Sequence, residues 1–150
     1  MPAQALPADL SADQAYKKAF DFLMATQYAQ AEAWFKGFLQ QHATHALADN
    51  AYYWLGETYL VQDRLDQAAI TFGQGLQAFP QGNKAPANLL KLGVALERLG
   101  KPDLARSTWQ KLVTDFPKAA EADKANEFLK TMANVAPADG AAAAANPQQP

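Results

Sequence analysis

Residues 50–80, NAYYWLGETYLVQDRLDQAAITFGQGLQAFP, decide the fold. Apolar side chains in 52–59 recur at spacings of three and four residues, as they do along one face of a helix. The polar run 62–64 interrupts this pattern, and the same period resumes over 65–76. Pro80 then ends the second segment, because proline cannot continue a helix. The stretch therefore predicts two antiparallel helices joined by a short turn.

The same pattern occurs three times when the sequence is shifted by 37 residues without a gap. Phe79-Pro80 aligns with Phe116-Pro117, whereas the first copy has His42-Ala43 at that place. Small residues let the paired helices approach closely, and we expect Phe72 to fill the space between neighbouring pairs. Three copies in phase predict an all-α protein, an α-solenoid of helical hairpins. The other aligned sets are Ala19, Gly56 and Gly93; Ala31, Ala68 and Ala105; and Phe35, Phe72 and Trp109.

Local signals mark where the helices begin and end. Ser11 with Gln14 is a capping-box pattern, and Gly100 followed by Pro102 is typical of one helix ending and the next beginning. Residues 1–10 and 134–150 are rich in alanine and proline, and we expect both to be disordered tails. The expected domain is 11–133, with repeats at 12–48, 49–85 and 86–118 and a capping helix at 119–133. The expected helices are 11–25, 28–42, 46–61, 65–79, 85–99, 103–116 and 119–133.

Composition narrows the function. The 150 residues suffice for one domain, and 33 alanines against five β-branched apolar residues favour helix over strand. With 13 basic and 15 acidic residues the chain lacks the positive field that nucleic acid requires. It has no cysteine, no apolar run long enough to insert into a membrane and no signal-peptide pattern at its start. If the protein is exported, we expect this sequence to be a mature or excised piece.

Two copies of the pattern carry a family resemblance. Leu55-Gly56, Tyr59, Ala68, Phe72 and Pro80 recur as Leu92-Gly93, Leu96, Ala105, Trp109 and Pro117. This arrangement resembles the tetratricopeptide repeat, a helix–turn–helix unit of about 34 residues. The resemblance implies three helical hairpins followed by a C-terminal capping helix.

Three longer strings resemble a narrower family. They are YKKAFDFLMATQYAQAEAWFKGFLQ, NAYYWLGETYLVQDRLDQAAITF and KAPANLLKLGVALERLGKPDLARSTWQKLVTDFP. Over residues 14–133 the chain resembles the family of the Tol-Pal system protein YbgF, also called the cell division coordinator CpoB. The resemblance implies a non-enzymatic periplasmic protein of Gram-negative bacteria that binds TolA. Such a protein helps coordinate outer-membrane constriction with peptidoglycan synthesis, with a peptidoglycan synthase complex as a further partner.

The relatives also carry a signal peptide and a trimerising coiled coil ahead of the repeats. Neither pattern occurs in these 150 residues, so the resemblance implies a homo-oligomer only through a region upstream. The relevant interaction surface within this chain is then the repeat domain itself.

In such repeats the first helices of successive pairs line a concave surface that binds a partner. We expect Tyr53, Tyr16 and Leu90 to bury a peptide or an amphipathic helix there. Glu57 and Arg98 would fix its register by charge. By the resemblance, the full set facing this surface is Tyr16, Phe20, Leu23, Met24, Asn50, Tyr53, Glu57, Leu60, Leu90, Val94, Glu97 and Arg98. The alternative is that several of these, Phe20 and Leu23 first, belong to the core.

The sequence gives little support for a carboxylate-binding site, a metal site or catalysis. Related repeats grip a C-terminal carboxylate with Lys, Asn and Arg, but this chain offers only Lys91 as a basic residue at those places. His42 and His45 straddle an expected helix end with no further ligand nearby, so we expect neither a metal nor a cofactor. Ser107 has no histidine in its pattern to act as a base, and we expect no enzymatic activity.

Two rival hypotheses stay open. One is a repeat-containing scaffold of another envelope machinery, such as a lipoprotein of outer-membrane barrel assembly, whose mature chain begins at a lipidated cysteine. The other is an enzyme or a cell-wall-binding domain that uses the same groove on glycan.

Overall fold

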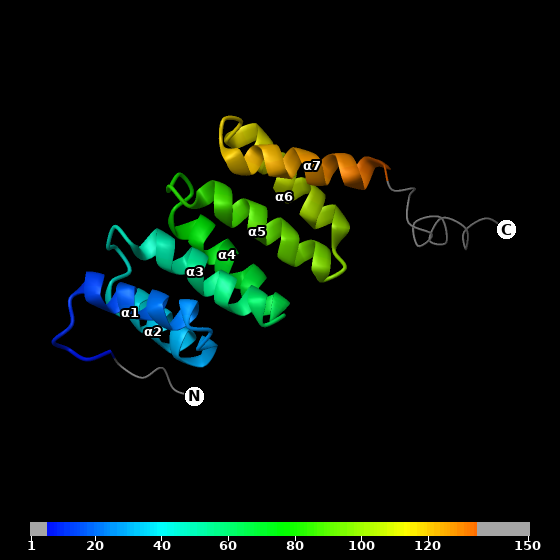
Figure 1. The fold of residues 1–150 in the computed structure, drawn as a ribbon. Coiled ribbons are helices and arrows are strands. Elements are labelled where there is room, and N and C mark those ends of the chain that lie inside the picture. Colours follow the sequence, from blue (N-terminus) through cyan, green and yellow to red (C-terminus); the bar gives the residue numbers. More distant parts are fainter. Residues whose placement is uncertain (1–5, 135–150) are drawn as a thin grey trace.

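The computed structural model describes residues 6–134, which form seven helices and contain no strand. Figure 1 shows them as successive antiparallel pairs followed by a single helix. The all-α hairpin architecture predicted from the sequence is confirmed, and every helix boundary lies within two residues of its expected place. The expected tail at 134–150 lies outside the described residues except for Asn134, which ends the last helix. The helices are α1 (Ala12–Met24), α2 (Tyr28–Gln41), α3 (Ala48–Val61), α4 (Leu65–Ala78), α5 (Ala85–Arg98), α6 (Pro102–Asp115) and α7 (Ala120–Asn134).

The stack of hairpins is curved. Cα atoms approach within 8 Å between α1 and α3, between α3 and α5 and between α5 and α7, whereas in residues 6–134 none do so between α2 and α4 or between α4 and α6. The first helices, which Figure 1 shows side by side along the stack, therefore lie closer together than the second helices, and we infer that their side is concave. We call the face formed by α1, α3, α5 and α7 the inner face, and that formed by α2, α4 and α6 the outer face.

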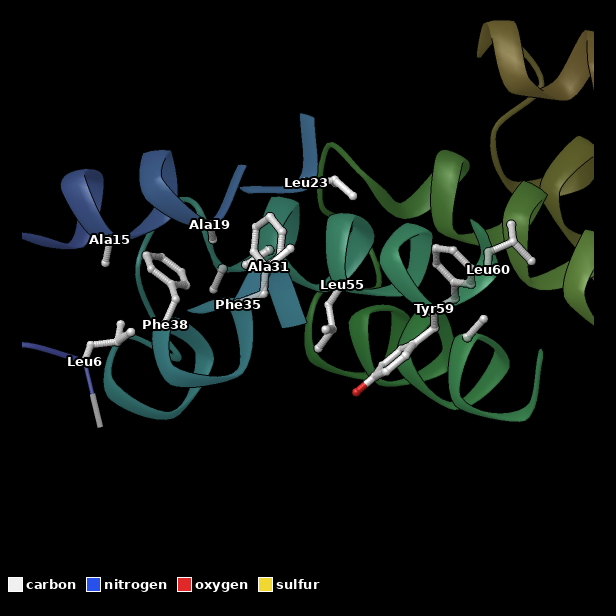
Figure 2. Packing of buried hydrophobic residues seen from close by; sticks show 14 of the residues in the cluster. Leu6, Ala15, Ala19, Leu23, Ala31, Phe35, Phe38, Leu55, Tyr59 and Leu60 are labelled. Carbon is white, nitrogen blue, oxygen red and sulfur yellow. The ribbon is translucent and has the colours of Figure 1, made fainter. Parts of the chain in front are cut away.

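Glycines allow two of the hairpins to close. A methyl group at Gly56 would overlap the ring of Phe72, and one at Gly93 would overlap the indole of Trp109. Both rings are fully buried, and Trp109 Nε1 donates a hydrogen bond to the Leu90 carbonyl at 3.1 Å. Phe72, expected to fill the space between neighbouring pairs, packs over Gly56 of its own hairpin and belongs to a core cluster that includes residues of the neighbouring hairpins. The core formed by such side chains runs from one hairpin to the next (Figure 2).

The connections between hairpins are repeated as closely as the helices. His42, Phe79 and Phe116 follow the second helices with φ of −132°, −135° and −131°. Each donates its backbone N–H to the carbonyl four residues earlier. The first copy thus keeps the backbone of the other two although it lacks their Phe-Pro ending.

The turns inside the hairpins require a left-handed residue. Thr26, Asp63 and Gly100 lie 37 residues apart and have φ of 58°, 60° and 77°. The Gly100 N–H donates to the Glu97 carbonyl and the Lys101 N–H to that of Leu96, which confirms the helix end predicted there. Glycine adopts this conformation freely, whereas a β-branched threonine is strained in it.

Thr26→Gly is therefore expected to stabilise the protein by about 1 kcal/mol, because it removes the strain of a β-branched side chain in the left-handed region. Gly100→Ala at the equivalent turn should destabilise it by a similar amount. Urea unfolding of the two variants and the parent measures both effects. A Thr26→Gly protein less stable than the parent would contradict the assignment of strain to this turn.

The N-terminal segment departs from the expected tail. Leu6 is only 7% exposed and belongs to the same core cluster as Phe38. It lies against Gly37 of α2, where a methyl group would approach the Leu6 side chain to 2.7 Å. Within residues 1–10 the expectation of a disordered tail is thus wrong for the part at Leu6, because one leucine finds a gap above a glycine that the sequence pattern alone does not reveal.

Candidate functional site

The inner face brings together most of the side chains that the sequence placed there. Arg98 is exposed, and Met24 is 57% exposed at the end of α1. Leu23 and Leu60 are each 8% exposed and pack in the core (Figure 2). Placing Leu60 on the binding surface was therefore wrong, and for Leu23 the alternative of a core position holds. Each lies one residue before the exposed end of its helix, where a small rotation decides which side a residue faces. The half-buried members are Tyr16, Phe20, Asn50, Tyr53, Glu57, Leu90 and Val94.

An aromatic cluster lies between α1 and α3. The rings of Phe20 and Trp54 meet edge to face with centroids 5.1 Å apart, and Tyr53 meets Trp54 at 4.9 Å. The Lys84 ammonium, from the residue before α5, lies 4.9 Å from the Tyr53 ring centroid and 5.8 Å from that of Trp54. Half-buried rings of this size present large apolar area at low entropic cost, as binding hot spots do. Lys84 was not predicted as part of this site, because helical periodicity assigns a face only to residues within a helix and Lys84 precedes α5.

Tyr16, at the end of the inner face beside this cluster, is half-buried. Tyr16 packs edge to face on Phe35 and Phe38 and so belongs partly to the core of the first hairpin. Burial raises the pKa of its phenol, and hydrogen bonding with Asn50 and Trp54 partly opposes that rise. Tyr16 and Asn50 therefore contribute less free surface than Tyr53.

The two charges expected to fix a partner's register are already paired. Glu57 of α3 lies 3.2 Å from the Lys91 ammonium of α5, and Arg98 lies 2.6 Å from Asp63. Burial raises the pKa of Tyr53 to about 12, with further contributions from the negative charges of Glu57 and Glu121. The charges of Glu57 and Arg98 are thus balanced within the protein, so we expect binding to depend mainly on the apolar area of this face.

Two exposed aliphatic residues extend that area. Met24 and Val61 are 57% and 58% exposed and occupy the same position of the repeat at the ends of α1 and α3. The residues expected on the inner face from the sequence include Met24 but not Val61. The shift of 37 residues from Met24 to Val61 was the signal that could have found it. Exposed apolar residues that adjoin an aromatic cluster are typical of a docking surface.

The outer face has a groove of its own. It lies between α2 and α4 over α3 and has a volume of about 420 Å³. Ile70, 60% exposed, stands on one wall, and Gln40, Gln67 and Gln74 supply amides along it. A second hollow of about 520 Å³ lies on the outward side of α1, where Phe22 and Leu10 adjoin Lys17 and Lys18. Neither gathers as many aromatic side chains as the inner face.

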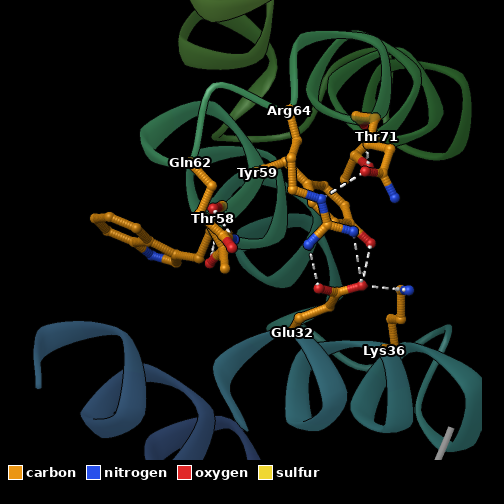
Figure 3. A network of polar contacts seen from close by, with 9 residues as sticks. Glu32, Lys36, Thr58, Tyr59, Gln62, Arg64 and Thr71 are labelled. Atoms are coloured by element: carbon orange, nitrogen blue, oxygen red, sulfur yellow. Dashed lines mark hydrogen bonds and ion pairs between the residues drawn. The ribbon is translucent and has the colours of Figure 1, made fainter. Parts of the chain in front are cut away.

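An ion network ties the first two hairpins together beside the outer groove (Figure 3). Glu32 of α2 accepts hydrogen bonds from Arg64 at 2.7 Å, from Lys36 at 2.7 Å and from the Tyr59 hydroxyl at 3.1 Å. The Arg64 guanidinium also lies 4.6 Å from the centroid of the Tyr59 ring. Burial alone would raise the pKa of Glu32, but the hydrogen bonds and charges of Arg64 and Lys36 lower it to about 2.

Glu32→Gln is expected to cost about 1–2 kcal/mol at pH 7, because it removes the charge on which three donors converge. The pKa of Glu32 is lower in the folded protein than its usual 4.5, so its charge stabilises the fold above about pH 4.5 and ceases to do so as the pH falls towards 2. Urea unfolding at pH 7, 4 and 2.5 should show the difference between parent and variant shrinking in that order. A difference independent of pH would contradict the role of the carboxylate.

The residues considered for metal binding and catalysis have structural contacts. His42 and His45 pack around the Phe38 ring, and His45 Nδ1 accepts a hydrogen bond from the Leu47 N–H at 3.1 Å. No group of three or more metal-ligating residues occurs within 6–134. Ser11 caps α1 in a complete capping box with Gln14, as predicted.

None of the helices within residues 6–134 is long and apolar enough to cross a bilayer.

Comparison with known proteins places this geometry in a fold class. Residues 50–82 and 87–119 match the tetratricopeptide repeat family. These segments cover the second and third hairpins, except for the first two residues of α3 and of α5, together with the loops that follow them. A solved structure described as the Arabidopsis OM64 TPR domain is similar, with a TM-score of 0.66 over 81% of this chain and 95% of that chain. The two sequences are 16% identical, so the likeness concerns the fold. No curated protein matches the sequence.

The first hairpin falls outside the matched residues, but it has the same left-handed turn as the two that match, and its helices of 13 and 14 residues are close to their 14-residue helices. Tetratricopeptide repeats typically form non-catalytic scaffolds that bind other proteins. Two of the three hairpins thus match the tetratricopeptide repeat, and residues 6–134 fold as a tetratricopeptide-like solenoid of three helical hairpins and a capping helix.

Proposed function

We propose that the inner face binds a segment of another protein, and that the contact centres on Tyr53 and Trp54. The aromatic cluster between α1 and α3 is the observation that carries this proposal. It combines half-buried aromatic area with exposed Met24 and Val61, while the acid and base at its border neutralise each other. Such a surface binds chiefly by burying apolar area.

The sequence resemblance to the YbgF/CpoB family supports a finer proposal. The partner is TolA, the location is the periplasm, and the role is to help coordinate outer-membrane constriction with peptidoglycan synthesis during cell division. The three strings that carry this resemblance include YWLGE at 53–57, which holds the centre of the aromatic cluster.

Isothermal titration of the chain with the periplasmic part of TolA, at 50 and 300 mM salt, tests this proposal. We expect saturable binding, and an affinity that changes less than about threefold between the two salts, because Glu57 and Arg98 are already paired and the contact buries mainly apolar area. Circular dichroism confirms the fold in each sample. Absence of binding by the folded chain would contradict TolA as the partner, and a steep loss of affinity with salt would contradict an apolar contact.

A further inference from the structure

Lys84 differs from the other cations of the inner face. Lys91 pairs with Glu57 and Arg98 with Asp63, whereas no carboxylate of residues 6–134 lies within 4.0 Å of the Lys84 ammonium. Its neighbours are the faces of the Tyr53 and Trp54 rings. An ammonium placed over a ring keeps hydrogen-bond donors free, because it has three and needs none for the ring contact.

The place of Lys84 in the fold fixes which end of the cluster is positive. Its backbone N–H donates to the Asp49 carboxylate at 2.9 Å, so the residue lies beside the first turn of α3. Glu57 and Glu121 act on Tyr53 strongly enough to help raise the pKa of its phenol. Although the Asp49 carboxylate is nearby, the Lys84 ammonium lies over the two rings, where its free N–H donors can meet an acidic group of a partner.

The apolar end lies further along the same helix. Val61 is seven residues after Trp54, which corresponds to about 10 Å along α3. Met24 occupies the equivalent place on α1, and Phe20 lies one turn before it. The surface is thus positive at the beginning of α3, aromatic in its middle and aliphatic at its end.

We propose that the segment bound on the inner face carries an acidic side chain that contacts Lys84, followed by apolar side chains that cover Trp54, Met24 and Val61. Because the Lys84 ammonium lies 5.8 Å from the Trp54 ring, the rise of about 10 Å from Trp54 to Val61 sets the expected spacing. An acid that contacts Lys84 and an apolar residue that covers Val61 are then about seven positions apart in a helical segment, or about three in an extended one. This inference rests on the proposed function, since it specifies the chemistry of the partner at the same face.

Selection of random 12-residue peptides displayed on phage tests the inference without knowledge of the natural partner. The targets are the parent chain, Lys84→Glu and the matched control Lys18→Glu. The Lys18 ammonium also lies over an aromatic ring, that of Trp34 at 4.8 Å, but on the first hairpin away from the Tyr53 cluster. We expect the parent and Lys18→Glu to select peptides enriched in Asp or Glu at the stated spacing from apolar residues. Lys84→Glu should select Lys or Arg there instead.

Titration of the most enriched peptide completes the test. The parent should bind it about tenfold more tightly than Lys84→Glu does, and Tyr53→Ala should weaken it as well. Peptides that need Tyr53 but show no acidic preference, or the same preference on Lys84→Glu, would overturn the inference and leave the proposed function intact. Peptides indifferent to Tyr53, or no selected peptide at all, would count against the proposed function itself.

Discussion

Replacing Trp109 with alanine is expected to destabilise the protein by about 3–5 kcal/mol, which approaches the whole stability of an ordinary domain. The indole is fully buried, packs on Phe128 of α7 with centroids 4.8 Å apart, and fills the space over Gly93. Its loss leaves a cavity where α5, α6 and α7 meet and removes the hydrogen bond to the Leu90 carbonyl. In a solenoid this cost falls on the terminal hairpin, and neighbouring hairpins lose the support of their stacked partner.

Urea unfolding followed by circular dichroism measures the effect of Trp109→Ala. Leu104→Ala is the matched control, because Leu104 lies on the same helix and is 53% exposed. The control should change the free energy of unfolding by less than about 0.5 kcal/mol. A loss below about 1 kcal/mol for Trp109→Ala would contradict its place at the centre of this hairpin.

Tyr53→Ala is expected to weaken binding of the protein partner about 30-fold, a loss of about 2 kcal/mol that is typical of a central aromatic hot spot. Tyr53 presents its ring between Trp54 and Lys84 at the middle of the inner face. The substitution removes partner contact and also frees the Lys84 side chain from one of its two rings.

Isothermal titration with the periplasmic part of TolA measures this loss. Ile70→Ala removes an exposed apolar side chain from the outer groove and should leave the affinity unchanged. Because Tyr53 also lies 6.1 Å from the Phe72 ring, the helicity and thermal stability of the variant are checked before titration. Equal affinity of a folded Tyr53→Ala protein, or a loss with Ile70→Ala instead, would place the contact elsewhere.

Periodicity predicted the fold because each hairpin depends on local rules that recur. The shift of 37 residues aligns Gly56 with Gly93 and Phe72 with Trp109, and each glycine lies against the large ring of its own hairpin. Capping by Ser11 and the left-handed Gly100 are likewise local, since each involves only residues within a turn. Helix boundaries could therefore be predicted to within two residues.

Features that depend on contacts between distant segments were not accessible in this way. Leu6 is buried because it meets Gly37, and Glu32 is held by Arg64 across two hairpins. Neither pair has a periodic signature. The core position of Leu60 was missed for a related reason: a helical period gives the face only approximately near the end of a helix.

The sequence predicted which face of the solenoid carries the candidate site, but not the side-chain contacts on that face. The aromatic content around Tyr53 followed from the repeat, whereas the pairing of Glu57 with Lys91 and the placement of Lys84 over the rings required the stacking of α3 on α5. Those contacts change the expected character of binding, because they leave the inner face apolar with one cation at its edge.

An NMR titration of the isotope-labelled chain with the periplasmic part of TolA tests the central claim most directly, since it reports which residues the partner touches. We predict that chemical-shift changes concentrate on the inner face of α1 and α3, around Phe20, Trp54 and Val61. Changes concentrated instead along the outer groove, at Lys36 and Gln74, would contradict the account.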